Sequence, residues 1–337
     1  MNGSRVGFMG FGTTLARAVD ASMDRTVVLG YTRLGSGLRA RWWPEDPAPG
    51  ALAGRRVLVT GATSGIGKAA VEGYLRLGAA VHVLGRNPEK VSATVAEARG
   101  RVPGAEVVGE TCDVGDLDAV RRWAGDLAGR VDRLDAILHN AGTMTGERRE
   151  TSPQGHELTL AVHVLGPHLM TALLADRLRA APEPSVVWMS SGGMYGARLR
   201  ADDADDIEYR TGSYDGVRAY ARTKRMQVVL AQEWARHDTT GRALVASMHP
   251  GWVATPGVSE HLPRFERLTR PLLRRDDDGA DTAVWLVATR PESREPHFWH
   301  DRAQRPVVLP GQRPPAPDAV ARLVDYVTDA TGAGVGL

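Results

Sequence analysis

An alternation of short apolar segments and longer amphipathic segments begins near residue 55 and runs through most of the chain. The apolar segments are rich in Val, Leu and Ile and several end in Gly, which is typical of buried strands. The segments between them carry apolar residues at helical spacing, as in "GIGKAAVEGYLRLG". Strand–helix–strand repetition at this spacing predicts an α/β fold, a doubly wound parallel sheet with helices on both faces. The expected strands lie within residues 55–61, 79–86, 105–114, 134–142, 185–193 and 243–251.

The 337 residues divide into three parts around this alternation. Residues 54–310 are expected to form a single doubly wound domain. Residues 1–53 are interpreted as an N-terminal extension and linker, because "RWWPEDPAPG" contains three prolines and a glycine that break regular structure. This stretch is expected to be a linker or a strap lying on the main domain. Residues 311–337 are expected to form a C-terminal helix and tail, with the helix near "DAVARLVDYVTDA".

Composition restricts the partners and the compartment. The formal net charge is only +2, so no strong attraction to nucleic acid is expected. No run of 18 apolar residues occurs, which argues against a transmembrane helix, and the N-terminus reads as neither a signal peptide nor a stop-transfer segment. The single cysteine, Cys112, rules out an internal disulfide and fits a reducing compartment, so we expect a cytoplasmic protein. Membrane association through residues 1–43 is a weaker alternative to a cover over the domain or a dimer contact.

The strongest local signal is "VTGATSGIGKA", which follows an expected strand and opens an expected helix. Gly61, Gly65 and Gly67 allow a tight turn and a close approach to a pyrophosphate. The N-terminus of the following helix offers free N–H groups and the positive end of the helix dipole. The competing interpretation is that these glycines only allow a tight turn and bind nothing. The strand–turn–helix context argues against it.

The end of the second expected strand, "HVLGRN", bears on the choice of cofactor. An acidic residue there would hydrogen-bond the ribose 2′-OH and select NAD, whereas this chain has Gly85 followed by Arg86. An arginine can pair with a 2′-phosphate, so NADP(H) is favoured over NAD(H); a solvated arginine in an Arg-rich chain is the alternative. Asp113 ends the third strand and either meets the adenine amino group or caps the next helix.

Lysine occurs at only three positions, and one of them, Lys224, follows Tyr220 by four residues in a segment of helical pattern. This spacing places both side chains on one helix face. A tyrosine has a reference pKa of about 10, and a nearby ammonium group lowers it by favouring the phenolate. Arg would not replace Lys here, because its broad guanidinium group has a different shape and charge distribution. Tyr-x-x-x-Lys alone is a weak pattern, and its position after a dinucleotide-type turn makes it specific.

These motifs together resemble the short-chain dehydrogenase/reductase family. The family's cofactor loop resembles "TGATSGIG", and its fourth-strand motif resembles "HNAG". Its fifth strand is similar to "VVWMSS" and its active-site helix to "YARTK". The segment that binds the nicotinamide carboxamide is similar to "HPGWVATPG". The match covers about residues 54–290 in the expected order. The stretches "GYTRLGSGLRARWW" and "GADTAVWLV" further resemble the subgroup of SDR family member 12 type.

The resemblance implies a Rossmann fold and assigns roles to individual residues. Ser191 would hold the substrate oxygen, with Ser190 as second choice. Tyr220 would donate or accept the proton, and Lys224 would lower the pKa of Tyr220 and bind the nicotinamide ribose. The other cofactor-binding residues are expected to be Gly61, Thr63, Ser64, Gly65, Ile66, Gly67, Arg86, Asp113, Val114, Asn140, Ala141, Gly142, Pro250, Gly251, Val253 and Thr255.

Two departures from the family pattern stand out. His163 occupies the place of an Asn that usually holds a water in the proton relay; it either supports a modified relay or is a structural histidine. Ser191 and Tyr220 lie 29 residues apart, where about a dozen is usual. The insert between them is expected to be a surface lobe beside the substrate mouth.

The sequence therefore predicts an NADP(H)-dependent oxidoreductase that interconverts a carbonyl and an alcohol, with no metal site. A low-activity NADP(H)-binding redox sensor or scaffold is the alternative. Dimers and tetramers are common in the family that this sequence resembles, so the resemblance implies a homodimer or homotetramer. An apolar substrate is suggested by four residues of a segment that reads as a lid, Leu262, Phe265, Leu268 and Leu272.

Overall fold

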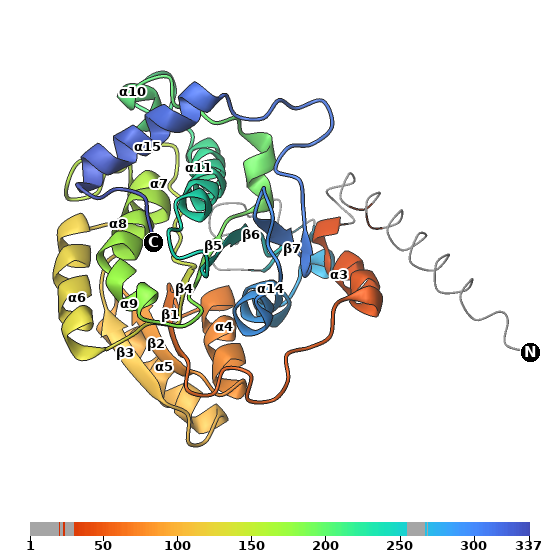
Figure 1. Ribbon diagram of the computed structural model, residues 1–337. Coiled ribbons are helices and arrows are strands. Elements are labelled where there is room, and N and C mark those ends of the chain that lie inside the picture. Colours follow the sequence, from red (N-terminus) through yellow and green to blue (C-terminus); the bar gives the residue numbers. More distant parts are fainter. Residues whose placement is uncertain (1–19, 21–22, 24–29, 255–266, 268) are drawn as a thin grey trace, which may run out of the picture.

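The structure is a computed structural model, and it describes residues 20, 23, 30–254, 267 and 269–337. Its centre is an eight-stranded sheet in the order β3-β2-β1-β4-β5-β6-β7-β8, in which only β8 is antiparallel to its neighbour (Figure 1). The reversal of strand order between β1 and β4 is that of a doubly wound fold, so the predicted fold class is confirmed. The strands are β1 (Arg56–Thr60), β2 (Ala80–Gly85), β3 (Val107–Thr111), β4 (Ala136–His139), β5 (Ser185–Met189), β6 (Leu244–Met248), β7 (Phe298–His300) and β8 (Ala303–Gln304).

The six expected strands all form, and the short hairpin of β7 and β8 is additional. β7 has three residues and β8 has two, which is too short for a periodic apolar pattern to appear in the sequence. The turn between them consists of Asp301 and Arg302, both in the left-handed region with φ of 50° and 54°. Two such residues match the type I′ turn of tight hairpins, although Gly and Asn are the usual occupants.

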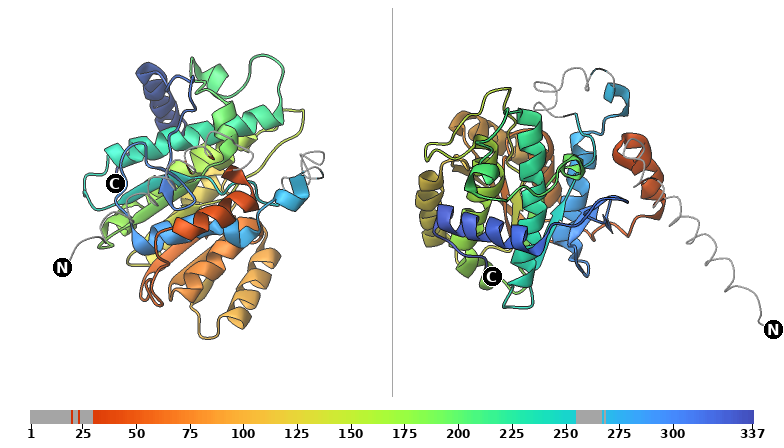
Figure 2. Two further views of the ribbon diagram at one scale, coloured as in Figure 1. Left: turned by 90° about the vertical axis from the view of Figure 1, so that its right-hand side faces the viewer. Right: turned by 90° about the horizontal axis from the view of Figure 1, so that it is seen from above.

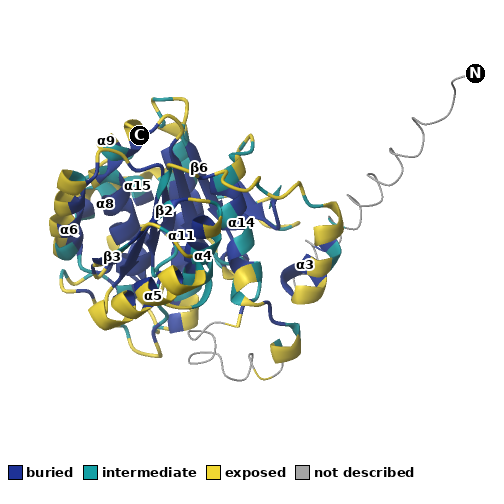
Figure 3. Cartoon of the chain, turned by 90° about the horizontal axis from the view of Figure 1, so that it is seen from below, coloured by how far each residue is buried: buried dark blue, intermediate teal, exposed yellow. Residues whose placement is uncertain are grey.

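Helices cover both faces of the sheet and divide the core in two. On one face lie α4 (Gly65–Arg76), α5 (Pro88–Arg101) and α14 (Asp276–Thr289). The other face is covered by α6 (Leu117–Arg130), α7 (Leu158–Leu160), η2 (Ala161–Leu165), α8 (Gly166–Leu173), α9 (Ala175–Arg179), α11 (Gly216–Arg236) and α15 (Pro317–Thr331). The strands between these layers are almost entirely buried, and exposed residues gather on the outer helix faces (Figure 3). Burial on both faces explains why the strands read as continuous apolar runs in the sequence.

Local sequence determines where the helices begin. Asn87 and Asp215 accept hydrogen bonds from backbone N–H groups of the first turns of α5 and α11, at 2.7 and 2.8 Å. α4 differs, because its N-cap residue Ser64 makes no side-chain capping hydrogen bond. The first N–H groups of α4 therefore keep their capacity to bind a ligand.

The described part of the N-terminal segment lies at the β7–β8 end of the sheet, where α3 (Arg33–Arg39) and η1 (Ala40–Trp42) sit beside α14 (Figures 1 and 2). Residues 44 and 45 are then bonded to the main domain. Trp285 Nε1 of α14 donates to the Glu45 carbonyl at 3.2 Å, and Arg302 Nη1 of the β7–β8 turn donates to the Pro44 carbonyl at 3.1 Å. This part of the extension thus lies on the main domain, as a strap would.

The remaining elements are short or terminal. η3 (Gly192–Gly196) follows β5, α10 (Ala204–Ile207) lies in the insert, and η4 (Arg270–Leu272) precedes α14. α15 buries Leu323 and Val327 in the core. None of the helices in the described part of the chain is both long enough and apolar enough to span a bilayer.

Candidate active site

The carboxyl ends of β1, β2, β4 and β5 open into one crevice with a volume of about 450 Å³. Parallel sheets place ligands at this edge, next to the reversal of strand order. Sixteen of the residues expected to bind cofactor or substrate line the crevice: Gly61, Thr63, Ser64, Gly65, Ile66, Gly67, Arg86, Asp113, Val114, Asn140, Ala141, Gly142, Ser190, Tyr220, Lys224 and Pro250.

The glycine turn is compact because neighbouring backbone comes close to it. A Cβ atom on Gly61 would lie 2.7 Å from the Cα of Ala141, and one on Gly67 would lie 2.3 Å from the Gly61 carbonyl oxygen. Asn140 Nδ2 supports the turn by donating to the carbonyls of Thr60 and Gly61, at 3.0 and 3.1 Å. With the uncapped N-terminus of α4 beside it, this turn presents N–H groups without side chains, which suits a pyrophosphate.

Two cations lie beside the end of β2, Arg86 directly after the strand and Lys90 in the first turn of α5. Arg86 and Lys90 are both exposed and both line the crevice. A Cβ atom on Gly85 would lie 2.7 Å from Thr63 Cγ2, so a larger residue there would push into the glycine turn. Lys90 was missed in the sequence, where it reads as an ordinary residue in the first turn of a helix. These residues fit a cofactor with a phosphate on its adenosine ribose.

Asp113 does not cap the next helix. Asp116 is the N-cap of α6 and accepts from Asp118 N at 3.0 Å, while Asp113 Oδ1 accepts from Gly115 N at 2.9 Å. The exposed Asp113 carboxylate lines the crevice, so of the two interpretations from the sequence the capping role is excluded.

Tyr220 and Lys224 lie one turn apart on α11 and face the crevice together. Lys224 Nζ is 5.4 Å from the centre of the Tyr220 ring and donates to the Met189 carbonyl at 2.8 Å. The Ser191 hydroxyl lies near Tyr220 and lowers the pKa of its phenol, although Ser191 is not among the residues that line the crevice. Ser190 Oγ instead donates to the Lys224 carbonyl at 2.8 Å. Ser191 is therefore the serine that meets the tyrosine hydroxyl, and Ser190 supports the helix.

Burial controls the protonation of this pair. It raises the pKa of Tyr220, an effect that the hydrogen bond with Ser191 offsets only in part. It also lowers the pKa of Lys224 to about 7. Removal from water favours the neutral form of both groups, and the charge of Lys224 is not among the causes of the shift at Tyr220, so the expectation that the lysine lowers the pKa of the tyrosine stays a prediction.

His163 lies in η2, a π-helical turn, and is completely buried. Its Nε2 accepts from Thr143 N at 3.0 Å, so Nδ1 carries the proton and donates to Thr223 Oγ1 at 2.8 Å. Burial, followed by the charge of Lys224, holds the pKa of His163 well below its usual value. The ring also packs edge-on against Tyr220, with centroids 5.4 Å apart. Both ring nitrogens thus have protein partners, which favours the structural interpretation of this histidine over a water relay.

Other expected site residues lie at the rim or outside the described residues. Gly251 and Val253 belong to the loop after β6, and Val253 pairs with Arg274 as an isolated β-bridge; neither lines the crevice. Thr255, Leu262, Phe265 and Leu268 lie outside the described residues, so their roles stay predictions. Within the described ranges, no cluster of three or more His, Cys, Asp or Glu side chains could hold a metal ion.

The insert between Ser191 and Tyr220 is anchored, and it is less superficial than expected. Glu208 is completely buried and pairs with Arg149 at 2.8 Å and with His156 at 2.6 Å. Tyr326 of α15 also hydrogen-bonds this carboxylate. These contacts lower the pKa of Glu208 to about 2 although burial alone would raise it.

Comparison with known proteins agrees with this geometry. The sequence pattern of the short chain dehydrogenases matches residues 55–199. Dehydrogenase/reductase SDR family member 12 of Bos taurus is 32% identical over 282 residues, which cover 83% of this chain and 87% of the relative. This chain belongs to the short-chain dehydrogenase/reductase family. The expected resemblance to the member 12 type of this family is confirmed as well.

Other proteins match this chain over similar lengths. DnrU of Streptomyces sp. (strain C5), named provisionally as a daunorubicin C-13 ketoreductase, is 35% identical, with 87% of this chain and 97% of DnrU covered. A solved short chain dehydrogenase from Salmonella enterica serovar Typhi has a TM-score of 0.62 at 25% identity and covers 77% of this chain and 100% of its own. A Shigella flexneri structure complexed with NADP has a TM-score of 0.58 at 25% identity, covering 71% of this chain and 93% of its own.

Proposed function

We propose that this protein is an NADP(H)-dependent oxidoreductase that interconverts a carbonyl group and an alcohol. The observation that carries the proposal is that one crevice contains both the glycine turn with its uncapped helix N-terminus and the Tyr220–Lys224 pair. Family membership supports the oxidoreductase class. When bound, the nicotinamide cofactor would supply or accept the hydride, and the protein would bind, orient and exchange the proton.

Each proposed role follows from a contact of the residue. Ser191 holds the substrate oxygen beside the Tyr220 hydroxyl, because the two side chains lie next to each other beside Gly193. Tyr220 donates the proton in reduction and accepts it in oxidation. Lys224 is fixed by the Met189 carbonyl on the same side of the phenol, where its charged form stabilises the phenolate.

The preference for NADP(H) rests on the end of β2. Arg86 and Lys90 supply two cations there, and no acidic residue stands at the strand end to bind a free 2′-hydroxyl. The NADP-bound relative from Shigella flexneri supports the same choice. Met144 and Val162 line the crevice, and DnrU is provisionally named for a ketone substrate; both support an apolar ketone as substrate class.

NADPH oxidation across aldehydes, ketones and quinones tests this proposal in wild type and Tyr220→Phe. We expect Tyr220→Phe to lose roughly 100-fold to 10,000-fold in kcat with little change in NADPH affinity, because only the proton donor is removed. Tyr326→Phe is the matched control, since it removes a hydroxyl outside the crevice. Equal rates in wild type and Tyr220→Phe would exclude the proposed role of Tyr220. Tight NADPH binding without turnover on any substrate would support the redox sensor or scaffold instead.

A cytoplasmic location and assembly into homodimers or homotetramers remain predictions. Cell fractionation and light scattering on the purified protein are the measurements that decide them.

A further inference from the structure

The N-terminal extension reaches the loops that carry the active site. Tyr31, next to α3, is 2% exposed although it belongs to a segment at the edge of the fold. Its ring lies against Gly192, the residue after Ser191: a Cβ atom on Gly192 would be 2.4 Å from Tyr31 Cε2. The same ring packs edge-on against His249 and Trp252, with centroids 4.5 and 6.1 Å away. One side chain therefore fills the space between the loop after β5 and the loop after β6.

The backbone of the same segment is bonded to the loop after β6. Trp252 N donates to the Tyr31 carbonyl at 2.8 Å, and Arg274 Nε donates to the same oxygen at 3.0 Å. Arg274 N in turn donates to the Trp252 carbonyl at 2.7 Å. Pro250 of this loop lines the crevice, and Arg274 Nη1 donates to its carbonyl at 3.3 Å. The position of this crevice wall is thus tied to residues 30–31 by several hydrogen bonds.

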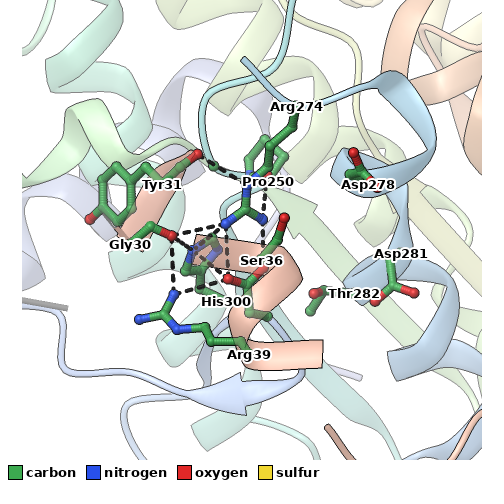
Figure 4. A network of polar contacts seen from close by, with 12 residues as sticks. Gly30, Tyr31, Ser36, Arg39, Pro250, Arg274, Asp278, Asp281, Thr282 and His300 are labelled. Atoms are coloured by element: carbon green, nitrogen blue, oxygen red, sulfur yellow. Dashed lines mark hydrogen bonds and ion pairs between the residues drawn. The ribbon is translucent and has the colours of Figure 1, made fainter. Parts of the chain in front are cut away.

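Buried charges hold the segment in place. Arg39 Nη1 and Arg274 Nη2 both donate to the Gly30 carbonyl, at 3.2 and 2.9 Å, and Figure 4 shows the two guanidinium groups converging on it. Asp301, in the β7–β8 turn, accepts from Arg39 at 2.9 Å and from Arg274 at 2.5 Å. Burial alone would raise the pKa of Asp301, but Arg274 and Arg39 hold it below its usual value. The carboxylate therefore stays charged and joins α3 to the segment that precedes α14.

We propose that Tyr31 is a positioning residue of the active site, which sets the separation between the Ser191–Gly192 turn and the Pro250–Trp252 loop. Tyr31 does not line the crevice itself, so it acts through these two loops. Its effect on turnover rests on the proposed function, whereas its effect on the loops does not. The N-terminal extension is then part of the site that would hold the nicotinamide and the substrate carbonyl.

The alternative is that residues 30–39 only cover the edge of the sheet. A cover would contribute to stability, and its loss would affect all ligands of the folded protein equally. A positioning segment acts on one end of the crevice only. Adenosine 2′,5′-bisphosphate separates the two cases, because it occupies only the adenine end, which is built by α4 and β2 and is not contacted by Tyr31.

The experiment compares full-length Tyr31→Ala and Leu34→Ala with wild type. Leu34 is the matched control, an apolar residue of α3 whose side chain is 59% exposed. For Tyr31→Ala we expect faster hydrogen–deuterium exchange in peptides covering residues 190–196 and 249–254, and unchanged exchange around β2. We expect NADPH to bind roughly tenfold more weakly, with adenosine 2′,5′-bisphosphate unchanged. Tyr31→Phe, which keeps the ring, should restore both readouts.

Equal exchange and equal NADPH affinity in Tyr31→Ala and Leu34→Ala would overturn the proposal, as would a parallel loss of both ligands. If Tyr31→Ala does not fold, Tyr31→Leu leaves a smaller cavity and is judged by the same criteria. If the wild type binds NADPH but turns over no substrate, the proposed function fails, while affinity and exchange still decide the positioning role.

Discussion

The two ends of the crevice are built in different ways. At the glycine-turn end, formed by β1, α4, β2 and Asn140, the important contacts join residues no more than 80 positions apart, such as Asn140 and Thr60. At the tyrosine end, the turn after Ser191 packs against Tyr31, and the Pro250–Trp252 loop is bonded to Tyr31 and to Arg274, which pairs with Asp301. The hydrogen bond from Arg274 to Gly30 joins residues 244 positions apart. The glycine-turn end thus needs segments that are less distant in sequence. The tyrosine end forms only when much more distant segments of the chain pack against each other.

The largest expected effect is a loss of stability when the charge of Asp301, which holds the tyrosine end together, is removed. Asp301→Asn keeps a side chain that tolerates the left-handed turn but leaves Arg39 and Arg274 buried without this carboxylate. Loss of one partner from a buried ion pair costs about 3–5 kcal/mol, so the free energy of unfolding should fall by that amount in urea titrations.

The control for this prediction is Asp46→Asn. Asp46 pairs with Arg302 at the surface, where its side chain is 84% exposed, so removing its charge should change the free energy of unfolding by less than about 1 kcal/mol. Equal effects of the two substitutions would contradict the view that buried charges hold the tyrosine end together.

A second substitution tests the glycine-turn end. Arg86→Ala removes an exposed cation from the end of β2, so NADPH should bind about 10-fold to 100-fold more weakly while NADH binding stays unchanged. Fluorescence titration with both nucleotides measures the two affinities. Arg76→Ala, an exposed arginine of α4 outside the crevice, is the control and should change neither affinity. An unchanged NADPH-to-NADH preference in Arg86→Ala would remove Arg86 from the proposed phosphate site.

The smallest expected effect is a dependence of stability on pH that originates at Lys224. Burial lowers the pKa of Lys224 to about 7 from its usual 10.5. Between these values the unfolded chain binds a proton that the folded chain does not, so this lysine destabilises the fold at pH 7 and does so less as pH rises. In the cofactor-free protein, the free energy of unfolding of wild type should therefore rise between pH 7 and pH 9 relative to Lys224→Met.

Urea titrations at pH 7, 8 and 9 measure this difference. Lys68→Met, which removes a partly exposed lysine paired with Glu97, should follow the wild-type slope. If Lys224→Met shows the wild-type slope as well, Lys224 is charged in the folded protein at pH 7 to 9, and the burial argument for this end of the crevice is wrong.

The difference between the two ends of the crevice also explains which features the sequence could predict. The strands, the glycine turn and the Tyr220–Lys224 pair depend on short-range patterns, and the structure places them as expected. Lys90 escaped notice because nothing in its local sequence distinguishes it from a solvated helical lysine. Tyr31 and Asp301 escaped notice because each has a partner more than 150 positions away in sequence, Gly192 for Tyr31 and Arg39 for Asp301.

His163 illustrates a different limit. The sequence placed it at the position of the relay residue and left two interpretations open. The choice depends on which atoms meet its two ring nitrogens, and Thr143 and Thr223 come from different segments of the chain. Protonation states are similarly unpredictable from sequence, because the raised pKa of Tyr220 comes from burial and the spacing of the two residues does not encode burial.

The ion pair of Arg39 with Asp301 joins residues 262 positions apart in a chain of 337 residues. During synthesis on the ribosome, Arg39 emerges early, but its partner is translated only when most of the protein is already outside the exit tunnel. The glycine-turn end has all its components long before that moment. The segment around Arg39 is therefore made before the glycine turn but reaches its final place after it, and the wall of the crevice beside Pro250 is completed only with this segment.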